Sequence, residues 1–155
     1  MKIEGSHLFK SPGEKVWNCL IDPQVLARCI PGCEKLELAG EDSYNAVLKI
    51  GIGALKGTFI SHIRLQDKEP LSQYKLVVEG EGGLGFLKGE GLIRLAASGA
   101  ETNVSYSGEV QIGGLIASVG QRMLQGFAKQ TISRFFSSLA RETEVTSESA
   151  PTSNN

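Results

Sequence analysis

The 155-residue sequence has little of what marks a metal site, a nucleic-acid interface or a membrane span. It contains two histidines and three cysteines, and its formal net charge is -1. A nearly neutral chain lacks the basic surface that binds nucleic acid. The longest apolar runs are far shorter than the ~20 residues that a membrane-spanning helix needs. Because no signal peptide precedes the first predicted strand, we expect a cytoplasmic protein that binds no nucleic acid.

The cysteines do not form a recognisable metal or redox motif. Cys29 and Cys33 flank a Pro-Gly pair in CIPGCEKLE, and a tetrahedral zinc site needs about four ligands. His7 and His62 are not expected to complete such a site, because the strand alternation places them on opposite faces of the sheet. A redox pair has no second motif to support it. We therefore interpret the stretch as a structural turn and predict no metal ligands.

The length favours a single domain. A chain of about 150 residues buries roughly 68–70% of the surface that it exposes when unfolded, so it can stabilise a core without disulfides or metals. We expect the domain to cover residues 1–142. From residue 143 the sequence TEVTSESAPTSNN is almost free of apolar residues, which predicts a disordered tail over 143–155.

The N-terminal part is predicted to contain one short strand and two short helices. Residues 3–9 alternate as a strand, and the following SPGE has the pattern of a capping box, with Ser11 as N-cap and Pro12 as first helical residue. Asp22-Pro23 repeats the start signal for a second helix, which Pro31-Gly32 ends.

Residues 34–112 show an apolar period of two, which is typical of strands. About six strands follow one another, with apolar residues at one parity and polar residues at the other, as in an antiparallel sheet covered on one face. The glycine-rich stretch 80–91 lies between two of these strands. It therefore predicts a hairpin turn, because a phosphate-binding loop would lead into a helix.

Residues 115–142 are predicted to form one long helix, in which Gly120 and Gly126 each cost ~1 kcal/mol relative to alanine. Its apolar stripe consists of Ile116, Val119, Met123, Phe127, Ile132, Phe135 and Leu139. This helix is the only element able to cover the apolar face of so long a sheet. The predicted fold is therefore an α+β helix-grip, a curved antiparallel sheet wrapped around a long C-terminal helix, with two short helices after the first strand.

Several inward positions of the predicted sheet hold small residues: Gly5, Ala46, Ser61, Gly80, Gly91 and Gly108. Such residues cannot fill the gap beneath a long helix to native packing density unless the helix approaches closely. We favour the alternative, an internal cavity. Its predicted lining is apolar and comprises Trp17, Leu26, Ile30, Leu48, Ile50, Phe59, Ile63, Leu76, Val78, Phe86, Tyr106, Met123 and Phe127.

An apolar pocket usually contains a few polar groups, and His7, Tyr44 and Tyr74 are the candidates here. Alternatively, His7 is a satisfied core residue or a general acid/base, and Trp17 is a core anchor rather than a ligand contact. No nucleophile elbow, HExxH motif or carboxylate pair at apolar positions occurs, and we see no partner that would tune a proton-transfer group. We therefore predict no catalytic residues.

The stretch DPQVLARCIPGCEKLE, residues 22–37, resembles the carbon monoxide dehydrogenase CoxG family of the START-like, SRPBCC superfamily. The similarity covers roughly residues 1–140. It continues through EKVW at 14–17, the glycine-rich stretch 80–91, Thr102 with Tyr106, GGLIASVGQR at 113–122, and the FF pair at 135–136.

This resemblance implies a helix-grip fold with an apolar cavity between sheet and helix. Members of the family are accessory proteins, typically encoded with molybdenum-containing hydroxylases, that help to place the enzyme at the cytoplasmic membrane. The expected partners are an apolar small molecule, molybdenum hydroxylase subunits and, by peripheral contact, the inner face of the membrane. Some members carry a C-terminal extension for membrane attachment. This chain ends in SESAPTSNN, without a hydrophobic or polybasic segment, so we do not expect its tail to anchor it.

The leading hypothesis is a non-catalytic protein that holds a lipid-like or quinone-like ligand and has no other cofactor. A quinone is the more specific choice, because a hydroxylase that passes electrons to a membrane chain needs an apolar acceptor. One alternative is a recruitment module whose cavity is incidental. Another is a START-like cyclase or hydrolase acting on a hydrophobic substrate, with His7 or a tyrosine as acid/base.

Overall fold

One antiparallel sheet forms the body of the protein. The computed structural model describes the backbone of residues 1–152 and the side chains of residues 1–144. The seven strands lie in the order β1-β7-β6-β5-β4-β3-β2, so the first and last strands along the chain are neighbours. They are β1 (Lys2–Phe9), β2 (Cys33–Gly40), β3 (Ser43–Ile52), β4 (Leu55–Glu69), β5 (Gln73–Gly82), β6 (Gly85–Ser98) and β7 (Glu101–Gly113).

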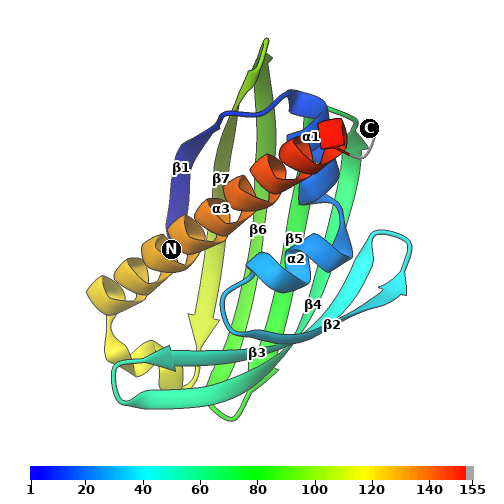
Figure 1. The fold of residues 1–155 in the computed structure, drawn as a ribbon. Helices are drawn as coiled ribbons and strands as arrows, with labels where there is room; N and C mark the ends of the chain where they lie inside the picture. The colour runs from blue at the N-terminus through cyan, green and yellow to red at the C-terminus, as the bar shows by residue number, and fades with distance from the viewer. Residues whose placement is uncertain (153–155) are drawn as a thin grey trace.

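Helical segments cover one face of this sheet: α1 (Gly13–Leu20), α2 (Pro23–Cys29), the 3-10 helix η1 (Leu115–Val119) and α3 (Gln121–Thr152). Figure 1 shows α3 crossing the face of the curved sheet, with α1 and α2 beside its C-terminal half. This is the predicted helix-grip fold, with the predicted element order. Within the described part of the chain, no helix combines the length and apolar character needed to cross a membrane.

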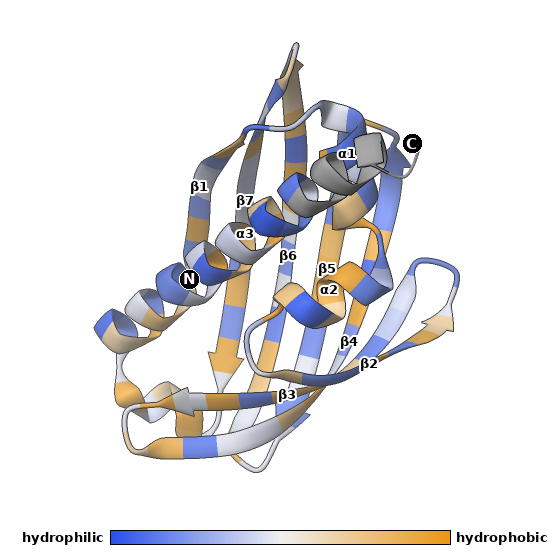
Figure 2. Cartoon of the chain, in the orientation of Figure 1, coloured by the Kyte–Doolittle hydropathy of each residue, from blue (hydrophilic) through white to orange (hydrophobic). Residues whose placement is uncertain are grey.

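The alternation along the strands separates an inner face from an outer face. On β4, Phe59, Ile63 and Leu65 are buried, whereas His62 and Arg64 between them are exposed. Figure 2 shows the same alternation of apolar and polar residues along the strands. The period of two thus directs one set of side chains toward the helices, as predicted.

The start of α1 differs from the predicted capping box. Pro12 is the N-cap, and no side chain caps the helix. The Ser11 hydroxyl instead donates to Thr143 Oγ1 at 3.2 Å, and the Ser11 carbonyl accepts a hydrogen bond from Thr102 Oγ1 at 2.8 Å. Ser11 is buried beneath α3, so its hydroxyl finds a tertiary partner rather than the local one that the sequence suggests.

The same contact moves the domain boundary. Thr143 falls in the predicted tail, yet its side chain is buried against Ser11. The packed domain therefore extends beyond residue 142. The side chains of residues 145–155 lie outside the described part of the chain, and so does the remaining prediction for the tail.

α2 starts and ends as the sequence predicts. Asp22 is its N-cap, and Asp22 Oδ1 accepts a hydrogen bond from the Gln24 N–H at 2.9 Å. After the helix, Gly32 has a φ of 76° and lies against the backbone of Lys49, where a Cβ would collide with the carbonyl oxygen. Glycine is thus required at the turn that leads into β2.

The predicted long helix from residue 115 is divided in two. Gly120, with a φ of 94°, turns the chain between η1 and α3. Because α3 begins later than predicted, its apolar stripe is also displaced. Leu124 and Phe136 are buried, whereas Met123, which the sequence places in the stripe, is 44% exposed.

The buried apolar residues form two separate clusters. The helical-end cluster lies where α1, α2 and the C-terminal half of α3 meet the sheet, and it includes Phe9, Val16, Trp17, Leu20, Leu26, Tyr44, Val104, Phe136 and Leu139. The hairpin-end cluster lies where η1 meets the β3–β4 and β5–β6 turns, and it consists of Ile52, Phe59, Leu84, Ile116 and Leu124.

Candidate functional site

Many apolar residues of the inner face are only half buried. They come from the sheet and from α3, and they include Leu48, Leu76, Val78, Leu87, Val110, Ile112, Phe127, Ile132 and Phe135. Within the described residues, α3 lies close to α1, α2, η1, β1 and β3 and stands farther from the central strands β4, β5 and β6. Sheet and helix therefore leave apolar surface unpacked along the middle of the molecule. We take this surface, called here the inner apolar surface, as the candidate site.

Most of the predicted lining residues lie on this side of the sheet. The helical-end cluster and the residues packed against it include Trp17, Leu26, Ile30, Leu48, Ile63, Leu76, Val78 and Tyr106. The hairpin-end cluster and its neighbours include Ile50, Phe59 and Phe127. Met123 lies over the β3–β4 turn, where a Cβ on Gly53 would come within 2.8 Å of its Cε.

Phe86 is not part of the inner apolar surface, although the sequence analysis places it there. Its side chain is 43% exposed and shares its strand face with the exposed Lys88 and Glu90. Its ring lies against Gly113, its partner on β7. The adjacent Leu87 has the inward parity and is half buried in its place.

The candidate polar residue His7 belongs to an aromatic group that joins β1 and β7 to α3. Its ring stacks on Phe136 with a centroid distance of 5.7 Å and meets Phe9 edge to face at 5.0 Å. Tyr106 stacks on Phe136 from β7 at 5.5 Å. The hydroxyl of Tyr106 extends over Gly5, where a Cβ would lie 2.5 Å from it. These contacts are those of packing residues.

The two other candidate tyrosines lie in the helical-end cluster. The Tyr44 hydroxyl donates to the Ile21 carbonyl at 3.4 Å. Tyr74 meets Trp17 edge to face at 5.7 Å, and burial raises the pKa of Tyr74 well above its ordinary value. Both phenols therefore stay protonated at neutral pH and serve the core.

Ser61 is a buried polar residue that the sequence identifies only as a small inward one. Its side chain is 0% exposed, and its hydroxyl has no hydrogen-bond partner among the described residues. In the sheet it stands between Ala46 on β3 and Gly80 on β5. A Cβ at Gly80 would lie 2.8 Å from Ser61 Oγ. Strand parity reveals the position of Ser61, but the missing partner is visible only in the tertiary structure.

The cysteines lie in environments that disfavour thiolate chemistry. Burial, followed by the nearby Glu142 carboxylate, raises the pKa of Cys29 to about 11, and the same two causes raise the pKa of Cys19. Cys33 Sγ donates a hydrogen bond to the Lys35 carbonyl at 3.5 Å. Among the residues described, no three His, Cys, Asp or Glu side chains are grouped so that they could hold a metal ion. The geometry thus supports a structural turn.

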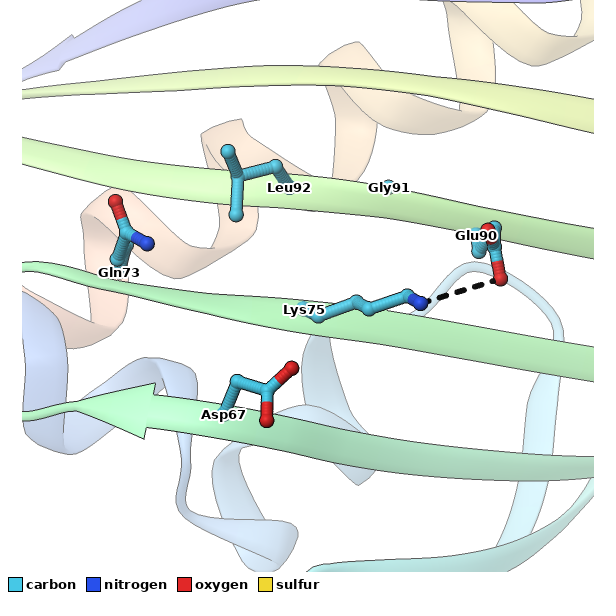
Figure 3. Close-up of a pocket in the computed structure, with 6 residues that line it drawn as sticks. All are labelled: Asp67, Gln73, Lys75, Glu90, Gly91 and Leu92. Atoms are coloured by element: carbon cyan, nitrogen blue, oxygen red, sulfur yellow. Dashed lines mark ion pairs between the residues drawn. The ribbon is translucent and has the colours of Figure 1, made fainter.

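Two hollows open on the outer face of the sheet. One, of about 250 Å³, is lined by Asp67, Gln73, Lys75, Glu90, Gly91 and Leu92, and Figure 3 shows Lys75 and Glu90 paired across it at 3.5 Å. The other, of about 360 Å³, is lined by Glu4, Gly5, Leu92, Arg94, Ser105, Tyr106 and Ser107. Charged and polar side chains dominate both, so neither resembles an apolar binding pocket.

The family model for the carbon monoxide dehydrogenase CoxG protein matches residues 5–144 of the chain. Among curated proteins, none matches. A solved structure of a conserved protein from Geobacillus kaustophilus is 44% identical, with a TM-score of 0.91, over 94% of this chain and 97% of that one.

More distant solved structures share the fold. A START superfamily protein from Mycobacterium smegmatis is 14% identical, with a TM-score of 0.71, over 94% of this chain and 98% of that one. The ZhuI aromatase/cyclase from Streptomyces sp. R1128 is 16% identical, with a TM-score of 0.66, over 93% of each chain. At such identities the likeness establishes the helix-grip architecture and carries no activity.

Proposed function

The chain belongs to the carbon monoxide dehydrogenase CoxG family, and on this premise we propose that it is a non-catalytic accessory protein. It holds an apolar, lipid-like or quinone-like ligand between the sheet and α3. It assists a molybdenum hydroxylase at the inner face of the cytoplasmic membrane. The observation that carries the proposal is the inner apolar surface, which the fold leaves half buried.

Apolar burial supplies the binding energy for such a ligand. Leu76 and Val78 on β5 and Phe127 on α3 keep part of their surface accessible to water although they belong to the inner side of the fold. An apolar molecule between them would remove this surface from water, at roughly 25 cal/mol per Å². A strongly polar molecule would gain nothing comparable there.

The contacts of the titratable inner residues favour binding over catalysis. His7 contacts aromatic rings, which orient the imidazole but do not exchange protons with it. The Tyr44 hydroxyl is engaged by a backbone carbonyl. A general acid or base needs a tuned group in reach of its substrate, and the cyclase alternative therefore rests on likeness of fold alone.

The hairpin end has the character of a membrane-contacting surface. Leu115 on η1 is 55% exposed, and Met123 projects from the first turn of α3 beside it. Lys56 and Arg122 are exposed at the same end and form no ion pair with any described residue. Exposed apolar side chains next to free cations favour contact with an anionic lipid surface.

Native mass spectrometry of protein purified gently from its own cells tests whether a ligand is held. We expect a bound lipophile in the wild type and its loss in Phe127→Arg, which places a charge on the inner apolar surface. Ser133→Arg, on the exposed side of the same helix, is the matched control and retains the ligand. A wild-type protein that carries no lipophile under any extraction condition contradicts the proposal.

The same variants separate a carrier from a recruitment module. A pull-down from cells that express the molybdenum hydroxylase should recover its subunits with the wild type and with Ser133→Arg. If Phe127→Arg recovers them equally well while lacking ligand, the interaction does not depend on the ligand, and the recruitment alternative is favoured. If no hydroxylase subunit is recovered with any form, the assignment of the partner is wrong.

A further inference from the structure

The middle of the inner face contains an unpaired hydroxyl, and we propose that this hydroxyl, on Ser61, recognises the polar end of the ligand. Ser61 would donate a hydrogen bond to a neutral oxygen, as found in a ketone, quinone or ester. The ligand class is thus an uncharged apolar molecule with an oxygen acceptor. This inference rests on the proposed function, because it assumes that a ligand occupies the inner apolar surface.

The burial of Ser61 is the first step. Its Oγ is inaccessible to water and has no partner within the described chain. A buried hydroxyl without a hydrogen bond destabilises a fold, whereas alanine at the same position would leave no unsatisfied group. A serine that the chain itself does not satisfy points to a partner supplied from outside the chain.

The neighbouring strands leave room at this point. Ala46 and Gly80, which flank Ser61 on β3 and β5, are the smallest side chains of their inner faces. The missing Cβ of Gly80 leaves open the position 2.8 Å from Ser61 Oγ. On β4 itself, the larger Phe59 and Ile63 stand on either side of Ser61. The floor of the inner apolar surface is therefore lowest at the hydroxyl.

The surroundings decide the charge of the ligand. The inner positions of β3, β4 and β5 near Ser61 are apolar, including Leu48, Ile63 and Val78, and none of their described side chains is ionisable except Tyr44 and Tyr74. A carboxylate or phosphate head would be buried here without a counter-charge, which is strongly unfavourable. A neutral acceptor gains the hydrogen bond without that penalty.

The test compares two probes of equal length, 2-undecanone and undecane, in competition with a fluorescent apolar dye bound to the purified protein. We expect Ser61→Ala to weaken 2-undecanone binding about 3- to 10-fold, the range of one neutral hydrogen bond, and to leave undecane binding unchanged. Ser107→Ala, on the exposed outer face of β7, changes neither. A melting temperature of Ser61→Ala at or above that of wild type shows that the weaker binding is not a folding defect.

Each other outcome decides against one part. If Ser61→Ala binds both probes as the wild type does, Ser61 takes no part in recognition while the ligand-binding proposal stands. If neither probe displaces the dye from wild type, the ligand-binding proposal fails together with this inference. If undecanoate at pH 8 binds wild type more tightly than 2-undecanone, the site selects an anion and the neutral class is wrong.

Discussion

The two ends of the molecule are built differently. At the helical end, α1, α2 and the C-terminal half of α3 close over the sheet around a large buried cluster. At the hairpin end, a small cluster is surrounded by turns in which Gly53, Gly114 and Gly120 have positive φ. The difference indicates that one end supplies most of the stability, while the other can yield to admit a ligand.

Polar contacts reinforce the closed end. Arg28 on α2 donates from both Nε and Nη2 to the Glu142 carboxylate on α3, at 3.3 and 2.7 Å, and this ion pair lowers the pKa of Glu142. The Ser11–Thr143 hydrogen bond joins the start of α1 to the same turn of α3. These links tie three helices together where the side chains are best packed.

Truncation of one core residue at each end tests the comparison most strongly. Phe136→Ala removes a buried ring that contacts His7, Phe9 and Tyr106, and we expect it to lower the free energy of unfolding by about 3–5 kcal/mol. Leu124→Ala in the hairpin-end cluster should lower it by about 2–3 kcal/mol. Urea denaturation measures both. A larger loss for Leu124→Ala would reverse the assignment of the stable end.

The middle of the molecule, between the two clusters, responds to added volume. Gly80→Ala brings a Cβ to 2.8 Å from Ser61 Oγ, so we expect a loss of about 1–3 kcal/mol in the free energy of unfolding. In the double variant with Ser61→Ala, the nearest side-chain atom is the β-carbon of residue 61 at 3.6 Å, and most of the loss should disappear. Equal losses in the single and double variants would show that the backbone, not Ser61, opposes the new methyl group.

Alkaline pH acts selectively on the helical end. Below pH 9, Cys29 is protonated in both folded and unfolded chains, and full stability is retained. Above pH 9 the unfolded chain ionises first, because burial holds the pKa of Cys29 at about 11 in the fold. The free energy of unfolding should therefore fall with pH, by on the order of 1 kcal/mol from this thiol at pH 10.

Cys29→Ala provides the comparison for this pH dependence. Urea denaturation between pH 7 and pH 10.5 should show a shallower decline for Cys29→Ala than for wild type. Burial also raises the pKa of Cys19, Tyr44 and Tyr74 in the same cluster, so some decline remains. Identical slopes for both proteins would remove Cys29 as a source of the effect.

Exposed apolar residues at the two ends give the smallest effect on stability. Leu115→Ser combined with Met123→Ser should change the free energy of unfolding by less than about 0.5 kcal/mol. It should weaken binding to phosphatidylglycerol-containing vesicles roughly 10-fold in co-sedimentation. Leu71→Ser, 50% exposed in the β4–β5 turn at the opposite end, is the matched control. Equal loss in both would mean that the hairpin end has no special affinity for lipid.

Local patterns predict much of this fold. The period of two over residues 34–112 identifies the strands and their inner faces, and Asp22-Pro23 identifies the start of α2. These signals are reliable because they depend on residues within a few positions of one another. For the same reason the family motif at residues 22–37 can be identified without a structure.

Predictions fail where a long-range contact overrides a local preference. Ser11 has the local pattern of a cap, but Thr143, 132 positions away, accepts its hydrogen bond. Leu115 and Met123 continue an apparent helical stripe, but Gly120 separates the segments to which they belong. Phe86 is large and apolar, but the parity that places Leu87 inside directs the Phe86 ring outward.

The sequence by itself determined the class of fold, the family and the inward parity of residues such as Ser61, because side-chain direction in a strand follows from local geometry. The tertiary structure decided which of those inward residues are packed and which are left half buried. It divided the core into two clusters and left the Ser61 hydroxyl unpaired between them, among the residues that the structure describes. Packing and hydrogen-bond satisfaction depend on which distant segments meet, and that is decided only when the sheet closes around α3.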